Sequence, residues 1–245
     1  MPDLTERAVV EALAKLTLSL RVVGVRSDGY HLLEAQMVTV DLADRLEISP
    51  GDGLTIEGPA ADGVPDGHNN LVFRALAAVG RQAAVRVVKR IPPGAGLGGG
   101  SADAAAVLRW ARCRDLAIAA SLGADVPFCL VGGRAKVSGI GEEVTALSWE
   151  GVEGHAYTLL TPPFGVSTAA VYRVWDTMGR PVAPGPNDLE PAALAVEPRL
   201  AEWRSRLGDA TGQTPVLAGS GSTWFVAGAY PGEGRTVVRA ARPSA

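Results

Sequence analysis

A run of small residues from Gly94 to Gly100 is the part of the sequence best suited to chemistry, because its backbone is almost bare. Six of its seven residues are Gly or Ala, Pro92 and Pro93 precede it, and Ser101 follows it at the start of a helix-forming segment. A glycine-rich turn that leads into a helix N-terminus directs several backbone N–H groups toward one point. We therefore predict that this turn binds the phosphate chain of a ligand, and the flanking prolines and helix argue against a flexible linker.

The segment after the glycine run is predicted to be a helix that reaches Trp110. Ser101 is a favoured N-cap residue, and Asp103 suits the positive end of the helix dipole. These two residues mark the expected start of the helix.

The glycine spacing alone leaves the identity of the phosphate ligand open. Gly94, Gly96 and Gly99 fit the dinucleotide-binding pattern G-x-G-x-x-G, and Asp115 lies 19 residues after Gly96, near the acidic position of that pattern. The two prolines, however, interrupt the strand that should run into the first glycine. The sequence contains no G-x-x-x-x-G-K-[ST], which excludes a Walker loop.

Length and composition describe a globular protein of 245 residues, 47% hydrophobic and 20% charged. A net charge of −3 gives no electrostatic reason to expect nucleic acid or an anionic membrane as a partner. Cys113 and Cys129 lack metal-like spacing and are expected to be reduced and buried. The N-terminal segment carries Asp3 and Glu6 rather than an apolar signal, and no stretch is long and apolar enough to span a membrane. We expect a soluble cytoplasmic protein.

Two further charged residues stand in unusual places. Lys15 lies in a segment, 12–25, in which leucines alternate with other residues, as in a half-buried strand. By itself, this pattern indicates a solvated strand lysine on the face opposite the leucines. Asp125 lies in an apolar stretch before Val126 and Pro127, where a helix-ending turn that leads into a strand is expected.

The remaining elements follow from periodicity and from Gly and Pro positions. Residues 51–70 are expected to be a hairpin and loop, residues 236–241 fit a strand or a helix equally well, and a domain boundary is expected near residues 149–155. Further strands are predicted at 38–42, 46–48, 85–89, 131–137, 156–160, 215–218 and 224–227, and further helices at 71–79, 116–122, 167–178 and 194–207.

Several separate motifs together resemble the GHMP kinases, the family of galactokinase, homoserine kinase and mevalonate kinase. The run from Pro92 to Gly98 with Ser101 resembles the shared ATP loop of that family, and residues 219–223 (GSGST) resemble its C-terminal glycine motif. Other stretches are similar to the branch of the family that acts on cytidylated methylerythritol. They are 14–16 (AKL) with 26–33 (RSDGYHLL), 98–105 (GGGSADAA), 122–128 (LGADVPF) and 187–191 (NDLEP), and the matches extend from residue 12 to about residue 226.

This resemblance implies an α+β fold of two domains, residues 1–150 with the ATP site and residues 151–245, with the active site in the cleft between them. It implies phosphorylation of the 2-hydroxyl of the methylerythritol unit by ATP with Mg²⁺. Asp125 would be the catalytic base and Lys15 the cation that orients it and offsets phosphoryl charge. One small-molecule substrate and a monomer or weak homodimer are expected.

The resemblance also assigns binding residues. Tyr30 and His31 would hold the cytidine, since a tyrosine ring can stack on a base, and Ser101 would contact phosphate or Mg²⁺. The substrate site would comprise Thr17, Asp28, Tyr30, His31, Gly219 and Ser220. The ATP site would comprise Asn70, Leu71, Lys89, Pro92, Pro93, Gly94, Ala95, Gly96, Leu97, Gly98, Gly99, Gly100, Ser101 and Ala102.

The sequence departs from the pattern of that branch at several points. Thr17 replaces a frequent Asn, Ala102 a frequent Ser, and Asp103 a frequent Asn. Asp125 lies only 22 positions after Asp103, and the chain after Phe225 is short. A kinase of another small alcohol, a nucleotide-binding protein without catalysis, and a dinucleotide-binding oxidoreductase are therefore alternatives.

Overall fold

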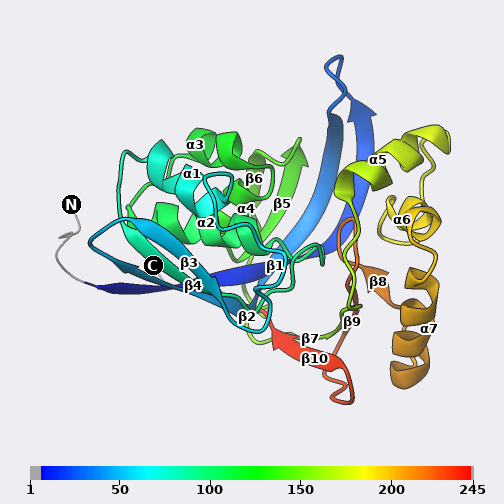
Figure 1. Ribbon diagram of the computed structural model, residues 1–245. Coiled ribbons are helices and arrows are strands. Elements are labelled where there is room, and N and C mark those ends of the chain that lie inside the picture. The colour runs from blue at the N-terminus through cyan, green and yellow to red at the C-terminus, as the bar shows by residue number, and fades with distance from the viewer. Residues whose placement is uncertain (1–6, 244–245) are drawn as a thin grey trace.

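The two longest strands, β1 (Ala8–Val25) and β2 (His31–Ser49), form an antiparallel hairpin that crosses the molecule (Figure 1). They belong to a computed structural model that describes residues 7–243, so the charges of Asp3 and Glu6 lie outside the described residues. The strand predicted at 12–25 is confirmed as part of β1.

Residues 38–42 and 46–48, expected as two strands, are both parts of β2. The pairing register shifts between Leu13 and Ala14 on β1, opposite residues 40–43 of β2. Such a bulge lets a strand bend and continue, so an interruption of the hydrophobic alternation does not end β2.

The hairpin is the centre of a larger sheet. Within residues 7–243 this sheet has six strands in the order β3-β4-β2-β5-β6, with β1 paired to β2. Only β3 and β4 pair in parallel among these neighbours. β3 falls within residues 51–70, so the prediction of a hairpin and loop there is wrong in part. The added strands are β3 (Gly53–Glu57), β4 (Ala84–Val88), β5 (Arg134–Gly139) and β6 (Glu143–Ala146).

Helices cover the first sheet, and the central one, α2 (Gly99–Trp110), packs on β1 and β2. α2 begins two residues before the expected Ser101, and its N-cap is Gly98 in the left-handed conformation without a side-chain cap. The helix is buried from Ala102 to Arg109, and its small alanines allow this close packing. Around it lie α1 (Leu71–Ala78), α3 (Leu116–Leu122) and α4 (Val126–Val131).

The segment after Asp125 is the helix α4, not the expected strand. Pro127 occupies its first turn, a position where proline suits a helix because the missing N–H would have no partner there. Cys129 of α4 is buried and Cys113 is partly exposed, which corrects the expectation that both are buried, and neither forms a disulfide.

A second sheet follows in the sequence, with the order β10-β7-β9-β8 within the described residues. The single helix predicted at 194–207 is instead two helices, because Pro198 lies between them. The elements are β7 (Ala156–Leu160), α5 (Thr168–Thr177), α6 (Glu190–Val196), α7 (Leu200–Thr211), β8 (Val216–Leu217), β9 (Trp224–Ala227) and β10 (Arg235–Arg239). The proposed domain boundary near residue 150 falls between β6 and β7 and stays a prediction.

The two glycine turns, far apart in the sequence, lie against each other. A Cβ on Gly96, whose φ is +77°, would lie 2.2 Å from the carbonyl oxygen of Ala218 and 2.8 Å from that of Gly221. The N–H of Thr223 donates a hydrogen bond to the carbonyl of Ala95 at 3.1 Å. Only a residue without a side chain permits this backbone contact.

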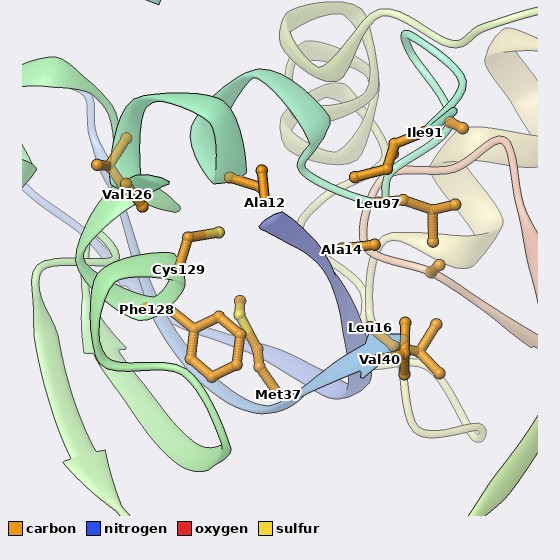
Figure 2. Packing of buried hydrophobic residues seen from close by; sticks show 14 of the residues in the cluster. Ala12, Ala14, Leu16, Met37, Val40, Ile91, Leu97, Val126, Phe128 and Cys129 are labelled. Carbon is orange, nitrogen blue, oxygen red and sulfur yellow. The ribbon is translucent and has the colours of Figure 1, made fainter. Parts of the chain in front are cut away.

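Buried apolar side chains join the helices to the first sheet. Figure 2 shows the ring of Phe128 beside Met37, with Cys129 and Val126 of the same helix close by. Phe128 is fully buried. In the described part of the chain, no helix is long and apolar enough to cross a membrane.

We expect Phe128→Ala to lower the free energy of unfolding by about 3–5 kcal/mol, because it removes a buried ring and leaves a cavity. Urea unfolding followed by circular dichroism measures this change. The control Val131→Ala removes a side chain that is 41% exposed on the same helix, and it should change the free energy by only about 0.5 kcal/mol. Equal effects of the two substitutions would contradict the assignment of Phe128 to the core.

Candidate active site

One cavity of about 690 Å³ opens beside the glycine loop, with walls from β1, β2, the turn at Gly219 and α5. It brings together most of the site residues predicted from the sequence. Those that line it are Lys15, Thr17, Tyr30, His31, Asn70, Leu71, Lys89, Pro92, Pro93, Gly94, Ala95, Gly96, Gly98, Gly99, Gly100, Ser101, Asp125, Gly219 and Ser220.

Three predicted site residues are not among the lining residues. Leu97 is fully buried, and its carbonyl accepts the N–H of Lys15 at 3.0 Å. Ala102 is buried within α2, and its N–H donates to the carbonyl of Gly98. Asp28 pairs with Arg26 at the exposed tip of the hairpin, 2.7 Å away.

Lys15 is buried, which overturns the solvated lysine indicated by the strand pattern alone. Its Nζ lies 3.4 Å from Oδ2 of Asp125 and donates a hydrogen bond to Oγ1 of Thr17 at 3.1 Å. The glycine loop covers the rest of its side chain, since a Cβ on Gly98 would lie 2.7 Å from Cγ of Lys15. A buried ammonium group needs such partners, because burial without them carries a large desolvation penalty.

Asp125 immediately precedes α4, and its carboxylate makes no capping bond to that helix. Its side chain is 35% exposed and lines the cavity. The carboxylate thus faces the cavity, with the ammonium group of Lys15 beside it. This arrangement can hold a proton acceptor next to a bound hydroxyl group.

The glycine loop reaches α2 through left-handed backbone at Gly94, Gly96 and Gly98, with φ of +67°, +77° and +69°. The N–H groups of the first three helical residues, 99–101, have no partner within the helix. Together with the helix dipole, such N–H groups favour an anion at a helix N-terminus. Phosphate binding by this loop stays a prediction.

Asn70 lines the cavity at the start of α1. Its Oδ1 caps α1 by accepting the N–H of Val72 at 2.8 Å, and its Nδ2 donates to the carbonyl of Pro65 at 2.7 Å. The amide therefore shapes the cavity by fixing the segment before α1.

Lys89, which also lines the cavity, contacts two carboxylates, those of Asp44 and Asp103. Burial alone would lower the pKa of Lys89, but Asp103 and Asp44 outweigh it and raise the pKa above its usual value. Burial raises the pKa of Asp103 to about 7 against the pull of Lys89, and Asp44 adds to the rise. Asp44 was not predicted, because an acid inside a strand gives no local signal of a site.

At the opposite end of the cavity, His31 is held by α5. Its Nε2 lies 3.0 Å from Oδ2 of Asp176, and its ring stacks on Tyr172 with centroids 4.5 Å apart. Tyr30 is 59% exposed beside it. Burial and the charge of Asp125 raise the pKa of Tyr172, which sequence reasoning missed because the residue lies in an ordinary amphipathic helix.

The turn at Gly219 is fixed by Asn187, from the 187–191 motif. Its Nδ2 donates to the carbonyls of Leu217 at 2.9 Å and Gly219 at 2.7 Å, and its Oδ1 accepts the N–H of Leu189. Ser220 in the same turn bonds Thr168 of α5 at 2.8 Å. Among the described residues, no three or more His, Cys, Asp or Glu side chains are grouped so that they could hold a metal ion.

Known proteins match this chain along most of its length. Residues 70–133 match the family described as GHMP kinases N terminal domain. The 4-diphosphocytidyl-2-C-methyl-D-erythritol kinase of Dinoroseobacter shibae is 38% identical, over 87% of this chain and 83% of its own. That of Paramagnetospirillum magneticum is 36% identical, over 95% and 92%.

Solved structures agree with these matches. A crystal structure of 4-(cytidine 5'-diphospho)-2C-methyl-D-erythritol kinase superposes with a TM-score of 0.68 at 35% identity, covering 89% of each chain. Homoserine kinase from Cytophaga hutchinsonii, at 17% identity and a TM-score of 0.59, covers 96% of this chain and 95% of its own and shares the fold. The α+β GHMP-kinase fold predicted from the sequence is confirmed, and the dinucleotide-binding oxidoreductase is excluded.

A lysine–aspartate pair beside a glycine loop and identity along most of both chains lead to one conclusion: the chain belongs to the family of 4-diphosphocytidyl-2-C-methyl-D-erythritol kinases, within the GHMP kinases.

Proposed function

We propose that the chain transfers the γ-phosphoryl group of ATP to the 2-hydroxyl of 4-diphosphocytidyl-2-C-methyl-D-erythritol. The contact of Lys15 with Asp125 at the cavity wall, facing the glycine loop, is the observation that supports this most directly. A kinase of this family uses ATP, and the names of the relatives supply the alcohol.

Asp125 acts as the base. It accepts the proton of the 2-hydroxyl as the oxygen forms a bond to the γ-phosphorus, and the bond from the γ-phosphorus to the bridging oxygen of ADP breaks. Lys15 orients the carboxylate and offsets the negative charge on the transferred group. Thr17 holds the ammonium of Lys15 in place through its hydroxyl oxygen.

The glycine loop binds the phosphates. Its N–H groups at 99–101 are fixed before the nucleotide arrives, so little reorganisation is needed during the reaction. Gly96 cannot carry a side chain without displacing the second glycine turn, so the loop is also held against that turn.

Mg²⁺ is proposed as the accompanying cation. This ion usually binds through substrate phosphates and only one or two protein groups, so it does not require a cluster of three or more protein ligands. The described residues contain no such cluster. The hydroxyl of Ser101, in the first turn of α2, is the protein group we assign to phosphate or to Mg²⁺. When bound, Mg²⁺ neutralises charge on the phosphates.

The aromatic end of the cavity supports a nucleobase. Tyr30 presents an exposed ring, the ring of His31 stacks on Tyr172, and all three residues line the cavity. A different small alcohol is the second candidate substrate. Thr17 stands where the branch frequently has Asn, and its hydroxyl oxygen accepts a hydrogen bond from Lys15, so the substrate contact that an Asn amide would make is replaced. The cytoplasmic location and the monomer or weak homodimer stay predictions.

The test of the function is ADP release with ATP, Mg²⁺ and 4-diphosphocytidyl-2-C-methyl-D-erythritol, beside parallel assays with galactose, homoserine and mevalonate. We expect turnover with the cytidylated alcohol alone, and loss of turnover when EDTA removes the divalent cation. Turnover with another of these alcohols and not with the cytidylated one would contradict the proposed substrate.

Asp125→Asn should lower kcat by about 10²–10⁴-fold, because the amide cannot accept the hydroxyl proton. ATP affinity, measured by calorimetry, should stay within about threefold, since the substitution leaves the glycine loop intact. Asp209→Asn, on the exposed face of α7, is the matched control with unchanged kcat. Full turnover by Asp125→Asn would remove Asp125 from the role of base.

Lys15→Met keeps the length of the side chain but removes its charge, and it should lower kcat by about 10²–10³-fold. Lys136→Met, at an exposed ion pair on β5, is the control. Steady-state kinetics distinguishes a role of Lys15 in phosphoryl transfer, which changes kcat, from a role in ATP binding alone, which changes KM. An unchanged kcat with only a raised KM for ATP would show that Lys15 binds ATP without acting on the transfer.

A further inference from the structure

Three charged side chains meet beside the cavity, apart from the Lys15–Asp125 pair. Nζ of Lys89 contacts the carboxylate of Asp44 and lies 2.6 Å from Oδ2 of Asp103. Their side chains are 3%, 0% and 5% exposed, respectively. Lys89 follows β4, Asp44 lies on β2 and Asp103 on α2, so the cluster joins three elements. We call these three residues the Lys89 clasp.

The clasp holds the chain where it enters the glycine loop. The second oxygen of Asp44, Oδ1, accepts the backbone N–H groups of Arg90 at 2.5 Å and Ile91 at 2.9 Å. These residues directly precede the proline pair of the loop. Asp44 therefore fixes the entry to the loop, while its other oxygen binds Lys89.

The clasp also holds the chain where it leaves the loop. Asp103 lies in α2, the helix that follows the loop, and it bonds Lys89. The approach is close at the first helical residue as well, since a Cβ on Gly99 would lie 3.3 Å from Nζ of Lys89 and 3.1 Å from Cγ2 of Ile91. The N–H of Gly99 is one of the three donors without a partner in the helix.

The middle of the loop is held by backbone bonds of Ala95 and Leu97, but its glycines have no side chains to pack. Glycine backbone adopts many conformations, so the separation of the two ends of the loop also depends on the anchors there. Lys89 is 2% exposed and two carboxylates contact its ammonium, which leaves little of the group for a nucleotide.

We propose that Lys89 is a positioning residue that, with Asp44 and Asp103, holds the two ends of the glycine loop at the separation needed for phosphate binding. It acts on ATP through the loop, in place of the direct contact expected from the sequence. The proposal rests on the proposed function, because it takes ATP as the ligand of the loop.

The test compares a ligand with phosphates and one without. Calorimetry measures the binding of ATP with Mg²⁺, and of adenosine, to the wild type and to Lys89→Met at a temperature where both are folded. We expect Lys89→Met to weaken ATP binding by about tenfold or more and to leave adenosine binding unchanged. Equal losses for both ligands would mean that Lys89 contacts the nucleoside directly and would overturn the proposal.

A rescue experiment uses the charges of the clasp. Lys89→Met leaves two buried carboxylates without their cation, whereas Lys89→Met with Asp103→Asn leaves only Asp44, whose Oδ1 already has two N–H donors. The double variant should regain thermal stability relative to Lys89→Met, because only one buried carboxylate is left without the cation. It should not regain ATP affinity, because the contact from Lys89 to α2 is still missing. Full recovery of ATP affinity would mean that Lys89→Met acts only through the unpaired carboxylates, and it would overturn the proposal.

Two further measurements keep the test decisive. If Lys89→Met does not fold, Asp103→Asn alone should retain ATP affinity within about threefold, because an amide oxygen can still accept a hydrogen bond from Nζ of Lys89. The double variant is then compared with Asp103→Asn directly. A double variant that binds ATP about tenfold more weakly than Asp103→Asn supports the proposal, and one that binds equally tightly overturns it.

Arg86→Met is the matched control. Arg86 also binds two carboxylates, Glu47 and Glu57, but on the exposed side of β4, where its side chain is 48% exposed. Arg86→Met should leave the affinities for ATP and for adenosine unchanged.

The binding test can be separated from the test of the proposed function, because binding is measured without turnover. A wild type that binds ATP but phosphorylates none of the alcohols would contradict the proposed function and leave the proposal for the Lys89 clasp standing.

Discussion

The burial of the Lys15 ammonium group is the constraint on which the rest of the structure depends. A charge in this position requires oxygen partners, and they are supplied by Asp125, directly before α4, and by Thr17 of β1 itself. The volume of the side chain then dictates its surroundings, because a Cβ on Gly98 would collide with it and one on Gly219 would lie 3.4 Å from its Nζ. Both glycine turns therefore close on one lysine, and the sheet that carries it, the helix that carries the base and the phosphate loop are placed by the same side chain.

Much of the architecture follows from local patterns. The alternation along 12–25 and the periodicity of 71–79 and 167–178 identify β1, α1 and α5, because each is a property of neighbouring residues. The failures have a shared cause, which is that local preference yields to tertiary packing or to a single breaker. α2 begins at Gly99, where the loop geometry permits it, although Ser101 is the better cap, and Pro198 divides a helix that periodicity alone would continue.

The candidate site shows the same division. The glycine loop is visible in the sequence because its chemistry belongs to consecutive residues, whereas Lys15 on its own is an ordinary strand lysine and gains its importance from the resemblance. Asp44, Tyr172 and Asp176 could not be found, since each reaches the site through contacts between segments distant in the chain. Tyr172 lines the cavity, and Asp44 and Asp176 bind the lining residues Lys89 and His31. No local pattern encodes such long-range contacts.

The alanine-rich packing of α2 bears on how relatives of this chain should be interpreted. The helix is buried from Ala102 to Arg109, so any larger side chain there would have to displace β1 or a neighbouring helix. Selection for shape alone can keep such a segment similar between enzymes whose substrates differ. Residues 70–133 include this helix, so agreement there reports common ancestry of the scaffold. Divergence of substrate choice within the superfamily is better sought at the tip of the β1–β2 hairpin and along α5, where Tyr30, His31 and Tyr172 line the cavity.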